Sequence, residues 1–336
     1  MRTLGKTLLF IGIAVVVLIV AGISLTVGWR PFIGPKARPL TSRKFEATPQ
    51  RLERGGYLFQ LTGCGGCHSQ HDWQTHGAPV TAGTEGGGQW LNMPDLPGHV
   101  VAPNLTPDPQ TGAGAWTDDQ LARAIREGIG HDGRALFPMM PYQPFRKMSD
   151  EDLASIIVYL RSLPPVHSQL EKTEIIFPVK YLIRSVPEPL EAPVASPDPA
   201  DRVKYGQYLA TIGGCADCHT PQHRGQPVAG FDYAGGMLMR GPWGEAATAN
   251  ITPDPSGISY YDEALFIQVM RTGYVKARKL NSIMPFGAFK DLTDDDLKAI
   301  FAYLRTVKPV KHRVDNTQPV TYCKLCRLKH GGGDQN

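Results

Sequence analysis

The sequence has little cysteine and little excess charge. Only six of its 336 residues are cysteine, and the formal net charge is +4. So mild a charge, without any run rich in Lys and Arg, argues against nucleic acid as a partner. Hydrophobic residues make up 42% and charged residues 20%, the composition of an ordinary globular protein. At this length we expect about two domains, each with its own core.

Proline and glycine are abundant, with 29 and 36 residues, which predicts loop-rich domains wrapped around something else. Two pentapeptides of the pattern Cys-x-x-Cys-His indicate the group around which the domains fold. In this pattern both thiols add to the vinyl groups of c-type haem, and the adjacent His ligates the iron. The two copies predict two haem c groups, attached and ligated by Cys64, Cys67, His68, Cys215, Cys218 and His219.

Two other interpretations of Cys-x-x-Cys are less favoured. Structural zinc needs a second ligand pair at a fixed distance, whereas each pair here has His at the next position. A redox-active dithiol has no obligatory His and usually lies in a thioredoxin-like context.

An internal repeat surrounds the two pentapeptides. Arg54–Leu58 precedes the first at the same distance as Tyr205–Leu209 precedes the second, and Asn104–Pro109 recurs as Asn250–Pro255. We therefore predict two copies of one mainly helical unit, residues 50–165 and 202–311. The expected fold is all-α: two tandem class-I-like cytochrome c domains after an N-terminal transmembrane helix.

The last helix of each unit has a clear beginning. Ser149 and Thr293 are each followed, three positions on, by a carboxylate, the pattern of a capping box. An apolar stripe at helical spacing follows in both copies.

A methionine stands nine residues before each of these caps, Met140 before Ser149 and Met284 before Thr293. A thioether favours reduced haem iron and fills the sixth coordination position. The shared register predicts Met140 and Met284 as axial ligands, although a lone Met is usually core filler. The methionines that could substitute for them are Met139, Met237, Met239 and Met270.

The N-terminal segment Leu8–Val27 is apolar and long enough to cross a bilayer as a helix. Its length favours an uncleaved anchor, residues 1–30, over a cleaved signal peptide. A juxtamembrane linker, residues 31–49, follows. A count of basic residues alone would place the body in the cytoplasm. Because bacterial c-type haem is attached outside the cytoplasmic membrane, we expect a single-pass anchor with both haem domains in the periplasm.

Two segments have less certain roles. A Pro-rich connector, residues 166–201, contains an apolar stretch, 175–186, that suits one of the two domain surfaces without indicating which. The tail, residues 312–336, holds Cys323 and Cys326, with Arg327 where haem attachment requires His. This pair is interpreted as an exposed disulfide or dithiol, with a metal site that includes His330 as an alternative. The histidines expected to be surface residues rather than ligands are His71, His76, His99, His131, His167, His223, His312 and His330.

The runs Val101–Asp108, Thr111–Thr117 and Pro138–Tyr142 resemble the cytochrome c subunit of bacterial membrane-bound alcohol and gluconate dehydrogenases. The resemblance covers roughly residues 50 to 310. It implies an electron carrier that accepts electrons from a dehydrogenase catalytic subunit and passes them to quinone or a terminal oxidase. Those subunits typically carry three haem domains and a C-terminal anchor, whereas this chain has two haem motifs and an N-terminal apolar segment.

Three functions are compatible with these features. The first is electron transfer in a membrane dehydrogenase or respiratory chain, by a protein that is not itself an enzyme. The second is the dihaem subunit of a cbb-type haem-copper oxidase, which also joins an N-terminal anchor to two haem domains. The third is a dihaem cytochrome c peroxidase, which needs an open sixth position on one haem. A matched Met in both copies argues against the third.

Overall fold

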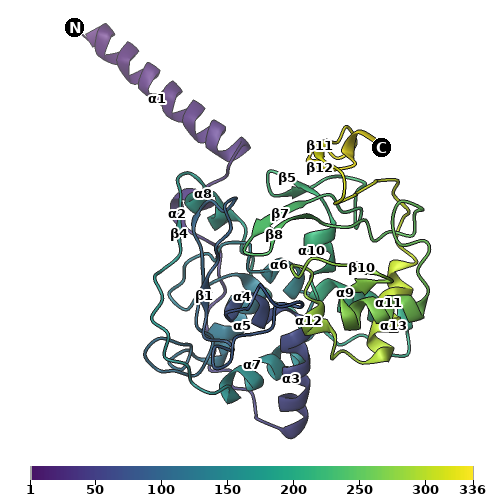
Figure 1. Ribbon diagram of the computed structural model, residues 1–336. Helices are drawn as coiled ribbons and strands as arrows, with labels where there is room; N and C mark the ends of the chain where they lie inside the picture. Colours follow the sequence, from purple (N-terminus) through teal and green to yellow (C-terminus); the bar gives the residue numbers. More distant parts are fainter. Residues whose placement is uncertain (1, 336) are drawn as a thin grey trace.

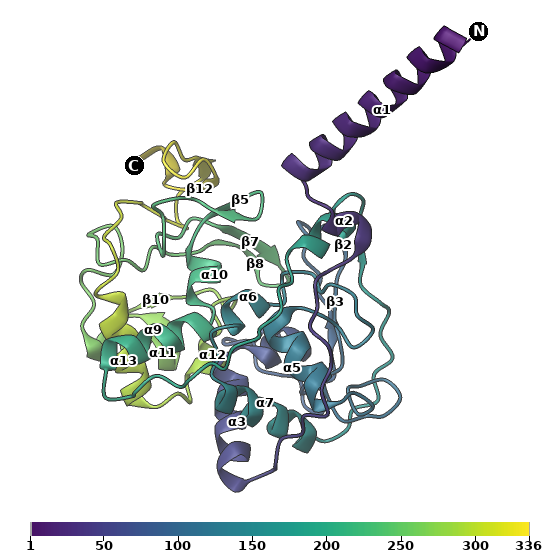
Figure 2. The ribbon, with the colours of Figure 1, turned by 180° about the vertical axis from the view of Figure 1, so that it is seen from behind.

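The computed structural model describes residues 2–335, so the outermost residues of the predicted anchor and tail, 1 and 336, lie outside the described residues. Helix α1 (Arg2–Leu25) projects away from the folded body (Figures 1 and 2). Its stretch Gly5–Leu25 is long and apolar enough to span a membrane, and none of it is buried against the protein. Both a membrane anchor and a signal sequence have these properties.

The body consists of two similar helical units, the first and second repeats. The helices of the first repeat are α3 (Pro49–Leu61), α4 (Cys64–His68), α5 (Asp118–Glu127), α6 (Tyr142–Phe145) and α7 (Asp150–Ser162). Their counterparts in the second repeat are α9 (Arg202–Ile212), α10 (Cys215–His219), α11 (Glu263–Thr272), α12 (Phe286–Phe289) and α13 (Asp294–Leu304). Figure 1 shows the two sets side by side.

In each repeat the first long helix packs against the last, α3 on α7 and α9 on α13. Glycine permits this close approach. A Cβ on Gly55 would lie 2.0 Å from the Ser155 carbonyl oxygen, and one on Gly206 would lie 1.9 Å from that of Ala299. The two glycines occupy equivalent positions in the repeated sequence, so both repeats depend on glycine for the same close helix contact.

The predicted N-caps are confirmed, but the second contact of a capping box is not made. The N–H groups of Ser149 and Thr293 donate to tyrosine hydroxyls of the other repeat, not to the carboxylates three positions on. Ser149 Oγ accepts a hydrogen bond from the Asp152 N–H (3.1 Å), and Thr293 Oγ1 accepts one from the Asp296 N–H (3.2 Å). The apolar stripes behind them, including Leu153 and its counterpart in α13, are buried in the core.

The all-α prediction is only partly right, because short antiparallel strand pairs join the helices. Across residues 2–335 the pairs are β1 (Gln89–Trp90) with β3 (Val101–Ala102), β2 (Gly98–His99) with β4 (Glu174–Ile175), β5 (Gln222–His223) with β6 (Gln226–Pro227), β7 (Leu238–Gly241) with β8 (Gly244–Ala247), β9 (Tyr274–Val275) with β10 (Arg278–Lys279), and β11 (Val320–Tyr322) with β12 (Lys329–Gly331). Strands this short carry little alternating pattern, which is why the sequence did not reveal them.

The connector lies on the first repeat. Strand β4 at its apolar stretch pairs with β2, with Gly98 opposite Ile175 and His99 opposite Glu174. The following elements, α8 (Val179–Leu182) and the 3-10 helix Ile183–Ser185, contact the short helix α2 (Arg30–Ile33) at the base of α1. The apolar stretch of the connector therefore covers one side of the first repeat. The sequence had not indicated which of the two domains it would contact.

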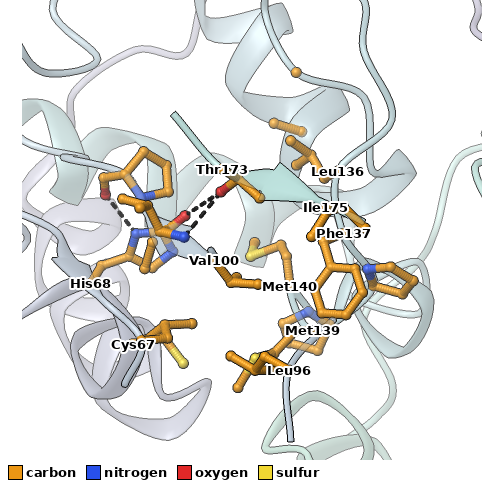
Figure 3. A pocket seen from close by; sticks show the side chains of 18 of the residues that line it. Cys67, His68, Leu96, Val100, Leu136, Phe137, Met139, Met140, Thr173 and Ile175 are labelled. Carbon is orange, nitrogen blue, oxygen red and sulfur yellow. Dashed lines mark hydrogen bonds between the residues drawn. The ribbon is translucent and has the colours of Figure 1, made fainter. Parts of the chain in front are cut away.

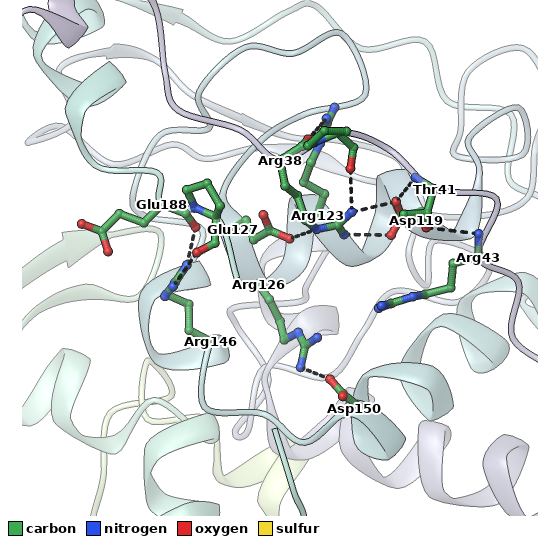
Figure 4. Close-up of polar contacts among 12 residues, drawn as sticks. Arg38, Thr41, Arg43, Asp119, Arg123, Arg126, Glu127, Arg146, Asp150 and Glu188 are labelled. Carbon is green, nitrogen blue, oxygen red and sulfur yellow. Dashed lines mark hydrogen bonds and ion pairs between the residues drawn. The ribbon is translucent and has the colours of Figure 1, made fainter. Parts of the chain in front are cut away.

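The segment between α2 and α3, which contains most of the predicted linker, is held to the same repeat by an ion-pair cluster (Figure 4). Arg38 forms two parallel hydrogen bonds with the buried carboxylate of Asp119 (2.8 Å each) and a third with Glu127 (2.8 Å). The Thr41 N–H also donates to Asp119, at 2.7 Å. Burial would raise the pKa of Asp119, but these donors outweigh it and hold the pKa below its ordinary value.

Candidate haem sites

Each Cys-x-x-Cys-His pentapeptide forms one turn of helix, α4 in the first repeat and α10 in the second. The residue before each turn is a glycine in the left-handed region, Gly63 at φ 67° and Gly214 at φ 69°. A side chain is disfavoured in this conformation, so glycine allows the chain to leave the preceding helix and begin a new turn at once.

The two motif histidines are held in the same way. His68 and His219 are buried, and their Nδ1 atoms lie 2.7 Å from the carbonyl oxygens of Pro103 and Ala249. Donation from Nδ1 leaves Nε2 unprotonated, the state in which a histidine can bind a metal. Burial also lowers the pKa of both imidazoles, which favours the neutral form that binds a metal.

The repeated Asn-x-Thr-Pro-Asp run builds the turn that carries this carbonyl. Asn104 directly follows Pro103, and its Oδ1 accepts hydrogen bonds from the N–H and the hydroxyl of Thr106 (2.9 and 2.7 Å). Its Nδ2 donates to the carbonyl of Val166 at 2.7 Å. The second repeat makes the same contacts around Asn250. Sequence reasoning found this run but missed its role, which is to position the histidine's hydrogen-bond acceptor.

A cavity of about 2610 Å³ extends from the first pentapeptide to the neighbouring repeat. It exceeds the roughly 300–1,000 Å³ of ordinary small-molecule pockets, so it has room for a macrocycle. Figure 3 shows Cys67 and His68 on one side of this cavity and Met139 and Met140 on the other. The structure therefore brings the predicted residues of the first site together around one space.

Met140 and Met284 occupy matching backbone turns. Met140 N–H donates to Phe137 O (3.1 Å), and Met284 N–H donates to Asn281 O (3.1 Å). Of the alternative methionines, Met139, Met237 and Met239 line the cavity, whereas Met270 is buried in α11. In the second repeat, Cys218 borders the large cavity, but His219 and Met284 are not among its lining residues.

The four thiols of the pentapeptides are unlike those of a redox dithiol. Partial burial raises the pKa of Cys64 to about 11 and of Cys215 to about 12, and it also raises the pKa of Cys67. Cys218 is exposed at the edge of the cavity. Reactive dithiols work by the opposite shift, a lowered thiol pKa. The environment therefore supports the attachment role rather than thiol–disulfide exchange.

Two aromatic side chains from different repeats meet at the cavity wall. Trp73 and Trp243 have ring centroids 4.9 Å apart, and both line the cavity. Next to them, His71 lies with its two ring nitrogens 2.6 and 3.0 Å from the carbonyl oxygens of Ala78 and Gly65. Both ring nitrogens of His71 thus lie within hydrogen-bond distance of backbone carbonyls, and its assignment as a residue that does not bind iron stays a prediction.

The exposure expected for the C-terminal tail was wrong, whereas the residues of the alternative metal site, Cys323, Cys326 and His330, do lie together. Cys323 and Cys326 are buried, at 0% and 1% exposure, so they are not an exposed pair. His312 and His330, expected at the surface, are both fully buried. These side chains were predicted to be exposed, and the prediction was wrong because the tail folds back on the second repeat instead of extending into solvent.

Comparisons with known proteins agree with this geometry. The family model for cytochrome c matches residues 52–164 and 203–308. The alcohol dehydrogenase (quinone) cytochrome c subunit of Gluconobacter oxydans is 28% identical over 287 residues, which cover 79% of this chain and 56% of that protein. The gluconate 2-dehydrogenase cytochrome c subunit of Pantoea cypripedii is 29% identical, covering 78% of this chain and 60% of that protein.

A third relative has nearly the same extent as this chain. The diheme cytochrome c-type protein of Cereibacter sphaeroides is 28% identical over 282 residues, which cover 82% of this chain and 92% of that protein. Two matched segments, each containing one Cys-x-x-Cys-His turn, agree with two covalently bound haems. This chain belongs to the cytochrome c family.

Proposed function

We propose that this protein is a membrane-anchored dihaem cytochrome c that transfers electrons and catalyses no reaction alone. The proposed attachment thiols are Cys64, Cys67, Cys215 and Cys218, and the proposed iron ligands are His68 with Met140 and His219 with Met284. When bound, haem c supplies an iron that cycles between its ferric and ferrous states. The observation that carries the proposal is the repeated histidine geometry, with Nδ1 committed to a carbonyl 2.7 Å away in both repeats.

The protein's residues have defined tasks in this function. The Pro103 and Ala249 carbonyls fix the tautomer and the orientation of the two histidines. Apolar side chains such as Leu96 and Val100 line the first site, and the polarity and burial of a redox site tune its potential. Met140 and Met284 would close the sixth position and thereby keep small ligands off the iron.

The partner is proposed from the relatives. Two of them are named as cytochrome c subunits, one of an alcohol dehydrogenase and one of a gluconate dehydrogenase. This chain spans only 56% and 60% of their length. We propose a dehydrogenase catalytic subunit as the electron donor and quinone or a terminal oxidase as the acceptor. Helix α1 would anchor the protein in the cytoplasmic membrane, with the haem domains in the periplasm. A role as the dihaem subunit of a cbb-type oxidase is the second candidate, supported by the N-terminal position of α1.

Optical spectroscopy of the detergent-solubilised protein tests the proposal. We expect two c-type haems per chain by pyridine haemochrome, a near-infrared Met-to-iron band in the oxidised form, and no spectral change when carbon monoxide is added after reduction. The double variants Cys64→Ala/Cys67→Ala and Cys215→Ala/Cys218→Ala should each retain one haem. Ready carbon monoxide binding by the unmodified protein would instead favour the peroxidase hypothesis, because it requires an accessible iron.

A further inference from the structure

Four potential metal ligands converge in the C-terminal tail, away from both pentapeptides. They are His312, Cys323, Cys326 and His330, and all four side chains are buried. One ligand atom from each, a thiol sulfur or a ring nitrogen, lies within 4.8 Å of all the others. Two cysteines and two histidines in one buried cluster are a donor set typical of structural zinc sites.

The backbone presents the two cysteines in a tight hairpin turn. Strands β11 and β12 flank them, and the Cys323 N–H donates to the Leu328 carbonyl at 2.8 Å. The Arg327 N–H donates back to the Cys323 carbonyl at 3.0 Å, and Arg327 itself is left-handed, with φ 61°. The turn brings both sulfurs to the side of the hairpin on which His330, in β12, also lies.

The histidine pair gives the strongest indication of a cation. His312 Nε2 and His330 Nε2 are 3.0 Å apart. Their Nδ1 atoms lie 2.8 and 3.0 Å from the carbonyl oxygens of Ala234 and Gly331, and a carbonyl can only accept. In neutral rings this assigns the proton to each Nδ1 and leaves a lone pair on each Nε2, which is the form of histidine that binds a metal. A metal ion between the two rings would accept both lone pairs.

The surrounding structure leaves space for the two rings. Gly236 has φ 93°, and a Cβ at this position would lie 2.6 Å from His312 Cε1 and 3.1 Å from His330 Cδ2. Glycine is thus required here both by the backbone conformation and by the imidazoles beside it. The loop of the second repeat is shaped around the cluster.

We propose that His312, Cys323, Cys326 and His330 bind one structural zinc ion. Tetrahedral zinc with sulfur at about 2.3 Å and nitrogen at about 2.0–2.1 Å places ligand atoms about 3.4–3.8 Å apart. The Cys323 Sγ to His312 Nε2 distance is 3.5 Å, and the nitrogen pair needs to separate by only a few tenths of an ångström from 3.0 Å. The carbonyl acceptors on Nδ1 are the outer-shell partners that histidine ligands of zinc usually have.

The site joins the tail to the haem-bearing repeat. His312 binds the Ala234 carbonyl, and the next residue, Gly235, donates its N–H to the His219 carbonyl at 2.7 Å. Zinc bound to His312 would therefore hold the tail against the loop that supports α10. The ion would act structurally, since four protein ligands leave no open position for a substrate.

Metal analysis of the full-length protein, purified without chelators, tests this proposal. We expect one zinc per chain alongside two haem irons, and zinc-edge X-ray absorption showing two sulfur and two nitrogen ligands. In the Cys326→Ser and His312→Ala variants, zinc should fall at least tenfold, while haem content stays at two. As a matched control, His167→Ala removes an exposed imidazole, 62% accessible, and should keep the zinc.

Two results would overturn the proposal. The first is zinc-free protein in which mass spectrometry of unreduced peptides finds Cys323 and Cys326 joined in a disulfide. The second is a stoichiometric ion other than zinc, such as copper, at this site. Because both measurements use the unmodified protein, they decide the question even if the variants fold poorly.

Discussion

The hydroxyl of Tyr208, in the second cytochrome c domain, donates a 2.6 Å hydrogen bond to the carboxylate of Asp152 in the first. The same hydroxyl oxygen accepts the Ser149 N–H at 3.1 Å, so it bridges Ser149 and Asp152 at the start of α7. Tyr57 of the first domain makes the equivalent pair of contacts with Asp296 and Thr293 at the start of α13. Each domain thus completes a helix cap in the other.

Replacement of Tyr208 with Phe tests this interface. The change leaves the buried Ser149 N–H without an acceptor and removes a donor from Asp152, so we expect the free energy of unfolding to fall by about 1–3 kcal/mol. Denaturant unfolding followed by haem absorbance measures the effect. The control is Tyr322→Phe, since Tyr322 is 54% exposed and its hydroxyl is dispensable. Equal stability of the two variants would show that the bridge contributes nothing.

Replacement of Met140 with Leu tests the proposed sixth ligand. Leu preserves the apolar volume but cannot bind iron, so one haem should lose its near-infrared Met-to-iron band while the other retains it. Met139→Leu is the discriminating comparison, because Met139 lines the same cavity and is expected to leave both bands intact. If Met139→Leu removes the band instead, Met139 is the ligand.

Replacement of Arg38 with Met tests how the predicted linker, residues 31–49, is attached to the first repeat. It leaves the buried carboxylate of Asp119 unpaired, for which we expect a loss of about 3 kcal/mol in unfolding free energy at pH 7. The matched control is Arg43→Met, since Arg43 is exposed and its guanidinium carbon lies 5.9 Å from the centroid of the Phe45 ring.

The Arg38 effect should depend on pH in a defined direction. Arg38 holds the pKa of Asp119 below its ordinary value in the folded state. The stability that this shift contributes is complete above the unfolded pKa of about 3.9 and is lost as the pH falls through the folded value. The difference between the Arg38→Met variant and the unmodified protein should therefore shrink below about pH 4. A difference that stays constant down to pH 3 would contradict the ion-pair explanation.

Replacement of Asn104 with Ala tests the turn behind His68. The Thr106 N–H and the Val166 carbonyl are the groups that lose a partner, and each buried group left unsatisfied costs about 1–3 kcal/mol. We expect a total loss of about 2–4 kcal/mol by denaturant unfolding, with a spectral change confined to one haem. Gln207→Ala, at an exposed position of α9 that does not line the cavity, should change neither quantity. Equal changes at both haems would place the defect outside this turn.

Features encoded in short stretches of sequence could be predicted. The pentapeptide turns, the caps at Ser149 and Thr293 and the span of α1 each depend on neighbouring residues, and the structure has them where the patterns indicate. The ligand role of Met140 and Met284 stays a prediction, supported by their shared turn.

Features that depend on distant parts of the chain could not be predicted. His312 is 11 residues from Cys323 and 18 from His330, and only the folding of the tail against Gly236 brings these rings and sulfurs together. Tyr57 and Tyr208 look like ordinary helix residues until the two domains dock. The short strands, such as β2 with β4, are likewise set by which surfaces meet rather than by alternation of side chains.

The exchange of tyrosines has a consequence for the ancestry of this chain. A contact in which each half offers the same two surfaces to the other is the arrangement found in symmetric homodimers. A single-haem ancestor with the tyrosine of α3 and the capped helix of α7 would have possessed both halves of this contact before any gene duplication. Fusion of two such genes would have needed only a connector, the place that residues 166–201 fill between the two repeats of this chain.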